Sequence, residues 1–217
     1  MLPLDPDRAV EARVRQIARR HLAQDDQALV ARAAGLGRAD LDALVQRDPA
    51  SHRDWRYVLS SYGGLEALLA HRLAHAIWSS APAPLGTPGP EHVLARQISE
   101  HAKVRTGVEI HPAARIGPGF VVDHGYGTVI GETTTIGADC YVLQGVVLGA
   151  TGIADNRPGQ RHPTLGDRVE VGAFARVLGP VRVGDGAFIG AMSLVLDDVP
   201  AGTRVHPGEP TIGRSCR

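Results

Sequence analysis

The strongest constraint on the fold is a six-residue period that runs through the second half of the chain. Ile, Val or Leu stands at each of its positions: Ile110, Ile116, Val122, Ile130, Ile136, Val142, Leu148, Leu165, Val171, Val177, Val183, Ile189 and Val195. Most of these residues are followed directly by Gly. Because an amphipathic helix repeats every three to four residues, this period indicates short strands separated by tight corners. Six residues to a side predict a triangular solenoid, whose coils bury their aliphatic edge by stacking on one another.

The composition agrees with a narrow solenoid core. The chain has 217 residues, of which 26 are Gly and only 4% are Phe, Trp or Tyr. We therefore expect a core of Val, Ile, Leu and Ala, with little room for aromatic side chains. So few rings also provide no base-stacking platform for a single-stranded nucleic acid.

Two interruptions of the period are the natural places for function. The step after Val122 is eight residues instead of six, so two residues bulge out within residues 123–127. The step after Leu148 is 17 residues, so about eleven extra residues loop out and end at Arg161 and His162. Insertions in a solenoid lie on its surface, where binding residues are favoured.

The chain before residue 107 follows a helical pattern. Asp5 before Pro6 is typical of a helix start, and apolar residues then recur at spacings of three and four. The clearest helix is predicted over residues 65–78, and a short one over residues 91–104 after a proline-rich connector. We divide the chain into three parts: an α-helical part over residues 1–106, a solenoid over residues 107–207 and a short tail over residues 208–217.

The charge balance argues against polyanionic partners. Lys plus Arg and Asp plus Glu both number 23, so no basic excess is present to hold nucleic acid or an anionic membrane. No stretch approaches the roughly 18 apolar residues of a membrane span, and no export signal begins the chain. Cys140 and Cys216 form neither a disulfide framework nor a CxxC metal pair; Cys140 is expected to fill a small space in the core, and Cys216 is a tail thiol. These features predict a cytoplasmic protein.

Glu109, Asp123 and His124 form the first candidate site. One full coil carries Ile110 onto Ile130, so Glu109 is expected one layer from the bulge that holds His124. A carboxylate beside an imidazole stabilises the imidazolium, which suits a general base that works near neutral pH. The alternative is that Asp123 and His124 simply hydrogen-bond their own turn, and the residues alone leave both interpretations open.

Arg161 and His162, at the end of the second insertion, form another candidate site. A guanidinium binds a carboxylate through two parallel hydrogen bonds, so this pair suggests recognition of a small acid. The alternative is a solvated loop charge. No nucleophile elbow and no phosphate-binding loop is present. His71 and His75 have the i, i+4 spacing of metal ligands, but no Glu follows His71, so packing or an interface is the better explanation.

These residues lie in segments that resemble the serine O-acetyltransferase family, enzymes that form O-acetylserine on the route to cysteine. Four segments of the solenoid occur in family order: residues 106–117, 122–133, 144–152 and 161–163. Residues 47–50, 61–64 and 71–75 resemble the family's N-terminal part. The resemblance therefore extends from about Asp48 to Val205. It implies an α+β chain in which a left-handed parallel β-helix follows a helical oligomerisation domain.

The resemblance also implies an assembly and a reaction. The family forms trimers, often paired into hexamers through the helices, with active sites between neighbouring β-helices. Acetyl-CoA is the co-substrate, and no metal is required. By position, His124 is the general base that takes the proton of the serine hydroxyl, and Glu109 is its carboxylate partner. His162 would lie beside the hydroxyl or the oxyanion.

The remaining site residues are assigned by the same resemblance. Asp48 and Asp123 would hold the ammonium group of L-serine, and Arg161 its carboxylate. The pantetheine of acetyl-CoA would touch backbone around three small residues: Gly149, Ala173 and Ala191. Residues 151–161 lack the Lys and the paired glycines often found in this insertion. The chain also lacks the Ile-terminated tail with which family members dock on O-acetylserine sulfhydrylase, so no such complex is expected.

Three alternatives remain open. An acetyltransferase of the same mechanism could act on another small hydroxy amino acid, such as homoserine. A zinc enzyme that resembles the γ-class carbonic anhydrases would need three histidines close together on the rod. The third is a non-catalytic scaffold, which would not explain why the Asp123–His124 and Arg161–His162 pairs stand at the two interruptions.

Overall fold

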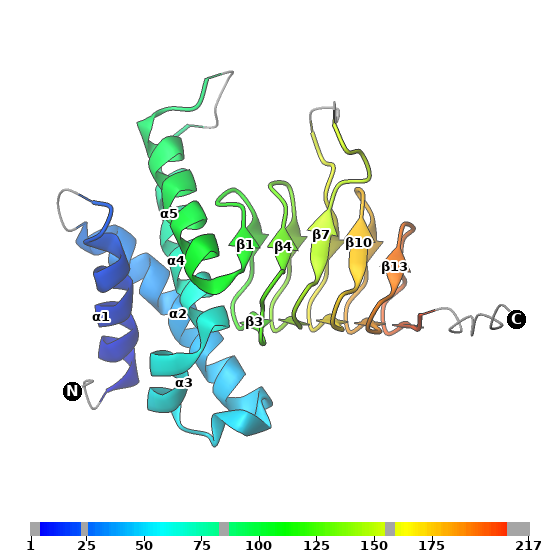
Figure 1. Cartoon of the computed structure of the whole chain (residues 1–217), viewed down its shortest axis with the longest axis horizontal. Helices are drawn as coiled ribbons and strands as arrows, with labels where there is room; N and C mark the ends of the chain where they lie inside the picture. The colour runs from blue at the N-terminus through cyan, green and yellow to red at the C-terminus, as the bar shows by residue number, and fades with distance from the viewer. Residues whose placement is uncertain (1–4, 23–25, 83–86, 155–158, 208–217) are drawn as a thin grey trace, which may run out of the picture.

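The computed structural model of the chain describes residues 5–22, 26–82, 87–154 and 159–207. A group of helices packs against one end of a rod of short strands (Figure 1). The predicted tail over residues 208–217, with Cys216, lies outside the described residues, as do parts of the proline-rich connector and of the second insertion.

The helical group confirms the predicted helices and extends them. Its elements in the described residues are α1 (Pro6–Ala18), α2 (Gln27–Arg47), the 3-10 turn Pro49–Ser51, α3 (Trp55–Ser61), α4 (Gly63–Trp78) and α5 (Pro90–Thr106). Asp5 caps α1 as expected, because its Oδ1 accepts a hydrogen bond of 3.0 Å from the backbone N–H of Asp7. The helix predicted over residues 65–78 is α4, and the one predicted over residues 91–104 lies within α5.

The rod consists of strands of two or three residues. They are β1 (Glu109–Ile110), β2 (Arg115–Ile116), β3 (Val121–Val122), β4 (Val129–Ile130), β5 (Thr135–Ile136), β6 (Tyr141–Val142), β7 (Val147–Gly149), β8 (Thr164–Leu165), β9 (Glu170–Val171), β10 (Arg176–Leu178), β11 (Arg182–Val183), β12 (Phe188–Ile189), β13 (Leu194–Val195) and β14 (Arg204–Val205). Successive strands join different sheets, so each coil contributes to three faces.

Three parallel sheets form these faces. Sheet 1 has the order β1-β4-β7-β10-β13, sheet 2 the order β2-β5-β8-β11 and sheet 3 the order β3-β6-β9-β12-β14. The register stacks Ile110 on Ile130 and Ile130 on Leu148, as the six-residue period predicts once the bulge is counted. The predicted triangular solenoid is therefore confirmed.

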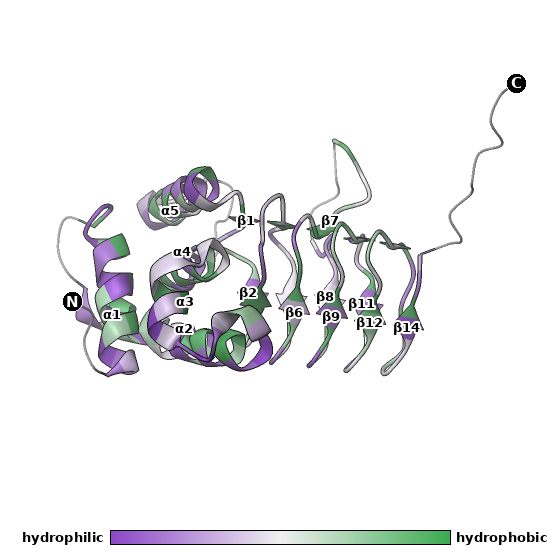
Figure 2. Cartoon of the chain, turned by 60° about the horizontal axis from the view of Figure 1, so that its bottom comes forward, coloured by the Kyte–Doolittle hydropathy of each residue, from purple (hydrophilic) through white to green (hydrophobic). Residues whose placement is uncertain are grey.

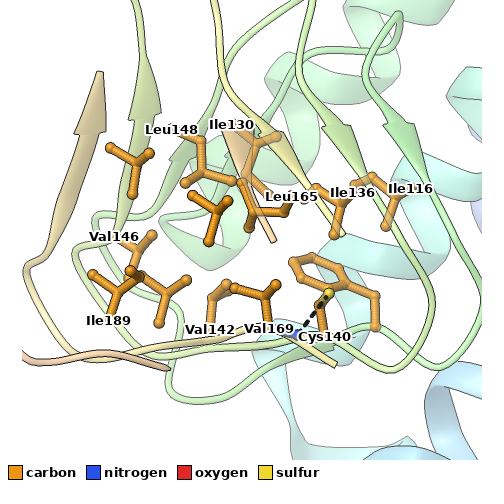
Figure 3. Packing of buried hydrophobic residues seen from close by; sticks show 14 of the residues in the cluster. Ile116, Ile130, Ile136, Cys140, Val142, Val146, Leu148, Leu165, Val169 and Ile189 are labelled. Atoms are coloured by element: carbon orange, nitrogen blue, oxygen red, sulfur yellow. Dashed lines mark hydrogen bonds between the residues drawn. The ribbon is translucent and has the colours of Figure 1, made fainter. Parts of the chain in front are cut away.

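The core of the rod is built from the repeat positions. All the aliphatic repeat residues point inward, and none exposes more than 8% of its surface. Figure 2 shows the same pattern as hydrophobic segments that recur in each coil, and Figure 3 shows the packed side chains. Cys140 is fully buried, as expected for a small core residue, and its Sγ accepts a hydrogen bond of 3.3 Å from the N–H of Val169.

One aromatic residue departs from the expected aliphatic core. Phe120 is fully buried in the first coil and belongs to the same apolar cluster as Ile116 and Ala67. The backbone N–H of Phe120 donates to Asp40 of α2, so the residue lies in the coil that meets the helices. The end of the solenoid therefore accommodates a side chain that its interior does not require.

The two interruptions lie at two different edges of the rod. Edge I comprises the turns from sheet 3 to sheet 1, residues 123–128, 143–146, 172–175 and 190–193. Edge II comprises the turns from sheet 1 to sheet 2, whose described residues are 111–114, 131–134, 150–154, 159–163 and 179–181. The bulge is part of edge I and the long insertion is part of edge II. In Figure 1 sheet 1 faces the viewer, and the described parts of the long insertion rise from its upper margin.

A buried ion pair joins the helices to the first coil. Arg72 of α4 donates from Nε to Oδ2 of Asp40 in α2 at 2.8 Å, and from Nη2 to Oδ1 at 2.9 Å. Arg72 also donates to the carbonyl oxygens of Ile116 at 2.5 Å and Gly117 at 2.6 Å. The N–H of Phe120 donates to Asp40 at 3.0 Å. Burial raises the pKa of Asp40, and the neighbouring Arg72 opposes that shift.

Close contact between α4 and β3 completes this junction. A side chain at Gly64 would place a Cβ 2.0 Å from the carbonyl oxygen of Val122, a distance that no real contact allows. Gly64 therefore lets the start of α4 lie directly on the backbone of the first coil. The residue after Val122 is Asp123, so this contact fixes the helices beside the first interruption.

We predict that Arg72→Met destabilises the fold by about 3–5 kcal/mol, because it leaves a buried Asp40 carboxylate without its cation. Urea unfolding at constant protomer concentration measures the loss. The matched control is Arg8→Met, because Arg8 is 82% exposed and lies 3.9 Å from Asp5. That variant should change stability by less than about 1 kcal/mol. Equal unfolding midpoints for the two variants would show that the buried pair contributes no more than a surface contact.

Candidate active site

His124 projects from edge I in the turn between β3 and β4. Its backbone has φ 57°, a left-handed conformation that is uncommon outside Gly, and 70% of its side chain is exposed. Its Nε2 lies 4.0 Å from Oδ1 of Asp123. The other Asp123 oxygen, Oδ2, accepts a hydrogen bond of 2.8 Å from the hydroxyl of Tyr141. The Asp123 side chain is therefore held by β6, which argues against the interpretation that the pair only stabilises its own turn.

Asp48 belongs to the same neighbourhood. It follows α2 directly and is 9% exposed. Its Oδ1 accepts from the N–H of Ala50 at 2.8 Å, and its Oδ2 accepts from the hydroxyl of Tyr62 at 2.7 Å. Asp48 and Asp123 both act electrostatically on the two tyrosines, and their negative charge adds to the effect of burial in raising the pKa of Tyr62 and of Tyr141. The two predicted ammonium ligands thus act on the same pair of tyrosines, and one of them, Asp123, lies next to the predicted base.

Arg161 and His162 lie on edge II and are anchored to the preceding coil. The backbone N–H groups of both residues donate to Oγ1 of Thr133 at 3.1 Å. The Arg161 guanidinium forms an ion pair with the carboxylate of Glu132. Arg161 therefore already binds a carboxylate in the free chain, which is the chemistry predicted for it.

The ring of His162 has a defined orientation. It is 8% exposed, and its Nδ1 accepts from the N–H of Thr133 at 3.1 Å. A nitrogen that accepts carries no proton, so the neutral ring holds its proton on Nε2. Burial lowers the pKa of His162, nearby Arg161 lowers it further, and Glu132 opposes the shift. Gly131 makes room for the ring, because a Cβ there would lie 2.2 Å from Nε2.

Glu109 lies on β1, one coil from β4, with Glu109 paired in register with Val129. Its two carboxylate oxygens meet cations of α5: Oε1 lies 3.3 Å from Arg96, and Oε2 lies 3.3 Å from Lys103. Within the described residues, no hydrogen bond or ion pair joins Glu109 to His124. Glu109 therefore lies in the coil next to the turn that holds His124, as predicted. Its role as the carboxylate partner of His124 stays a prediction.

The two groups of candidate residues flank sheet 1 without meeting across it. His124 and Asp123 lie at edge I, with Asp48 of the helical part close enough to act on Tyr141 of β6, and Arg161 and His162 lie at edge II. At about 3.3 Å per extended residue, one side of the coil separates the edges by on the order of 15 Å. A hydrogen bond needs about 3 Å. One chain alone therefore cannot bring both groups to one small molecule.

The three residues predicted to touch acetyl-CoA divide between the same edges. Ala173 and Ala191 lie on edge I in successive coils, where the N–H of Met192 donates to the carbonyl oxygen of Ala173 at 2.8 Å. Gly149 ends β7 beside edge II, where its carbonyl oxygen accepts from the N–H of Gly179 at 2.9 Å. The three positions do not form one continuous strip on a single chain.

The histidines outside these groups do not form a metal centre. His71 is 2% exposed, and burial keeps its pKa well below the ordinary value, consistent with a packing role. The ring of His75 lies 5.6 Å from it, and the Nδ1 of His75 lies 2.8 Å from the carbonyl oxygen of Pro112. Burial lowers the pKa of His111 to about 4. Among the described residues, no three His, Cys, Asp or Glu side chains are placed to hold a metal ion.

Sequence reasoning missed the side chains that hold the site residues. Tyr141 could have been found from the register, because β6 stacks on β3 and the N–H of Asp123 donates to the carbonyl oxygen of Val142 at 2.9 Å. Thr133 follows from the same arithmetic, one coil before His162. No periodic signal leads to Tyr62, because its place depends on how the helices dock.

Comparison with known proteins agrees with this geometry. The rod matches the family described as "Bacterial transferase hexapeptide (six repeats)" over residues 162–197 and the "Hexapeptide repeat of succinyl-transferase" over residues 127–151. The chain is 48% identical over 163 residues to a serine acetyltransferase of Helicobacter pylori, which covers 75% of this chain and 88% of that protein. The chain belongs to the serine acetyltransferase family.

Solved structures extend the similarity over nearly the whole chain. The serine acetyltransferase of Neisseria gonorrhoeae in complex with serine has a TM-score of 0.76 and 32% identity, covering 96% of this chain and 83% of that one. A serine acetyltransferase in complex with cysteine has a TM-score of 0.80 and 31% identity, covering 96% and 84%. The rod is a left-handed β-helix, as the resemblance implied. None of the described helices is long and apolar enough to cross a membrane.

We predict that the neutral His162 of this acetyltransferase-family chain carries its proton on Nε2 and titrates below the ordinary histidine pKa of about 6.5. Imidazole ¹⁵N chemical shifts of histidine-labelled protein, followed over pH, measure both properties. Gly131→Ala should displace the ring and alter these shifts. The control Gly35→Ala should not, because a Cβ at Gly35 meets nothing within 4 Å. A proton on Nδ1 would contradict the orientation described above.

Proposed function

We propose that this chain is a serine O-acetyltransferase, which transfers the acetyl group of acetyl-CoA to the hydroxyl of L-serine. The main support is that the carboxylates of Asp48 and Asp123 act on the same two tyrosines, with Asp123 next to the imidazole of His124. Two anions in one place suit an ammonium group, and the adjacent imidazole suits removal of a proton from a hydroxyl. Family membership and the serine complex of the Neisseria relative point to the same substrate.

The proposed reaction is direct transfer assisted by a general base. His124 takes the proton of the serine hydroxyl while the oxygen bonds to the thioester carbonyl carbon. The carbon–sulfur bond then breaks, and the imidazolium returns the proton to the sulfur of CoA. The hydroxyl is a weak nucleophile at pH 7, and a positioned base contributes about 10²–10⁴-fold. Placing serine next to the thioester contributes further.

The remaining residues have complementary tasks in this proposal. The serine carboxylate takes the place of Glu132 on the Arg161 guanidinium. The Nε2–H of His162 donates to the carbonyl oxygen as negative charge develops on it. Glu109 stabilises the imidazolium of His124 while sharing its carboxylate with Arg96 and Lys103. Small residues at the edges, Gly149, Ala173 and Ala191, leave the backbone accessible to pantetheine.

The proposal requires more than one copy of the chain. Because edges I and II lie on opposite margins of sheet 1, edge I of one chain and edge II of a neighbour together supply a complete set of ligands. A closed ring of three β-helices provides such contacts, so we propose a homotrimer, with the helical residues 1–106 available to pair two trimers. A sequence with only two cysteines, too few for a disulfide framework, and the proposed substrates fit a cytoplasmic location.

We predict that His124→Ala lowers the turnover of serine by at least roughly a hundredfold, because the general base is lost. Release of CoA is measured with serine, homoserine and threonine as acceptors. His206→Ala, which removes an exposed histidine near the far end of the rod, is the control and should keep full activity. If the wild-type protein released CoA faster with homoserine than with serine, homoserine would be the acceptor. If the wild-type protein released no CoA with any of the three acceptors, the result would favour a non-catalytic scaffold.

A second prediction concerns assembly. His124→Ala and His162→Ala chains, each inactive alone, should regain activity when they are unfolded and refolded together. If each site takes one histidine from each of two neighbours, random mixing leaves about a quarter of the sites intact. Recovery near that level supports a shared site. No recovery, in mixtures shown by mass spectrometry to contain hybrid assemblies, would place both histidines in one chain's site.

A further inference from the structure

Each of the two clustered carboxylates is held by a tyrosine hydroxyl. The phenol of Tyr62, between α3 and α4, donates to Oδ2 of Asp48 at 2.7 Å. The phenol of Tyr141, on β6, donates to Oδ2 of Asp123 at 2.8 Å. Both distances are typical of hydrogen bonds from a hydroxyl to an oxygen acceptor. The same arrangement therefore occurs twice, once from the helical layer and once from the rod.

We propose that Tyr62 and Tyr141 are positioning residues that fix the Asp48 and Asp123 carboxylates for the ammonium group of the substrate, and so set the preference for an amino acid over an acid without the amino group. This inference rests on the proposed function. It assigns no contact between the phenols and the reacting atoms. The tyrosines act through the carboxylates that they hold.

The hydrogen bonds leave each carboxylate with a defined orientation. At Asp48, Oδ1 accepts from Ala50 and Oδ2 from Tyr62, so rotation about the last side-chain bond would break one of two hydrogen bonds. At Asp123, Oδ2 accepts from Tyr141, which leaves Oδ1 directed toward His124 at 4.0 Å. Without the phenols, two anions that repel each other would be free to turn apart.

Both phenols remain donors in the working range of pH. Burial and the neighbouring carboxylates raise the pKa of each tyrosine above its ordinary value. A protonated phenol donates one hydrogen bond, and the carboxylate oxygen that it contacts accepts it. Each phenol therefore keeps a proton to donate to the aspartate oxygen that it contacts.

The tyrosines are themselves held in place. The guanidinium of Arg47 lies 4.8 Å from the centre of the Tyr141 ring, and Arg47 donates to the carbonyl oxygen of Asp139 and to Glu170, both at 2.7 Å. The ring of Tyr62 meets the ring of Tyr57 edge to face at 5.8 Å. These contacts restrict the phenols before any substrate arrives.

The test compares Tyr62→Phe and Tyr141→Phe with the control Tyr57→Phe. Each variant keeps the ring and removes one hydroxyl, and no hydrogen bond from the Tyr57 hydroxyl occurs within the described residues. We expect the KM for serine to rise by about tenfold in each test variant, because a hydrogen bond to a charged group is lost. The kcat should stay within about twofold, since the base and the acetyl donor are unaffected. Tyr57→Phe should leave both constants unchanged.

A ligand without an ammonium group separates positioning from general damage. 3-Hydroxypropionate has the carboxylate and hydroxyl of serine but no amino group, and its inhibition constant against serine should stay the same in all three variants. Equal weakening of serine and 3-hydroxypropionate would overturn the proposal in favour of a structural role. An unchanged KM for serine in both test variants would also overturn it.

The same measurements distinguish this inference from the proposed function. Wild-type protein that releases CoA with serine, while the tyrosine variants behave like Tyr57→Phe, refutes the inference alone. Wild-type protein that neither releases CoA with serine nor binds serine in calorimetry refutes both. Serine binding without turnover refutes the activity only, and the loss of serine affinity in the variants then tests the inference directly.

Discussion

The buried pair of Arg72 and Asp40 is the interaction on which the arrangement of the site depends. The guanidinium spans α2, α4 and the carbonyl oxygens at the first corner of the rod. Such pairs often contribute little net stability, since desolvation opposes attraction, but they are strict about geometry. Here the geometry matters because α2 continues from Asp40 to its end at Arg47, immediately before Asp48. An error in docking α2 would move Asp48 away from Asp123.

The triangular coil limits where polar chemistry can occur. Along each side the aliphatic residue points inward, and the strands are only two or three residues long. Few outward-facing side chains therefore remain on each sheet. Most changes in sequence and length can occur only in the turns at the corners. The bulge and the long insertion use that freedom at two corners of sheet 1. Division of ligands between these corners explains why a rigid rod of this kind would work as an assembly rather than as a single chain.

Much of the rod could be predicted because the six-residue period of aliphatic side chains is local in sequence and recurs in every coil. Every aliphatic repeat position is buried, and the strand register follows from counting six residues at a time. The helices of α4 and α5 were also visible in the spacing of apolar residues. Phe120 stands two residues before Val122, as the buried Cys140 and Val169 stand before Val142 and Val171, so its position follows the period, but the period does not predict an aromatic side chain there. Tyr62 and the Arg72–Asp40 pair depend on tertiary docking, which leaves no periodic trace.

In the candidate site, too, some residues could be predicted from the sequence and others could not. His124, Asp123, Arg161 and His162 could be chosen because they occupy the two breaks in a regular pattern. Their supporting groups were harder to find: Thr133 and Tyr141 require the register of neighbouring coils, and Glu132 and Lys103 require the directions of side chains. The approach of α5 to β1, which brings Arg96 and Lys103 to Glu109, is a property of the packed chain rather than of any motif.

The order of strands in the three sheets gives the rod two unlike ends. At the start, the helices contact β1 and β3, and Arg72 of α4 donates to the carbonyl oxygen of Ile116 in β2, so each of the three sheets meets the helices at that end. At the other end, β13 and β14 are the last strands of their sheets among the described residues, whereas β11 is followed by a parallel bridge from Val183 to Val199. Exposed strand edges invite pairing with other chains, and brevity is one of the ways in which proteins limit that risk. Each of these edges is two residues long. Removing or adding one coil there would leave edges just as short, so the rod can change length from this end without becoming a template for aggregation.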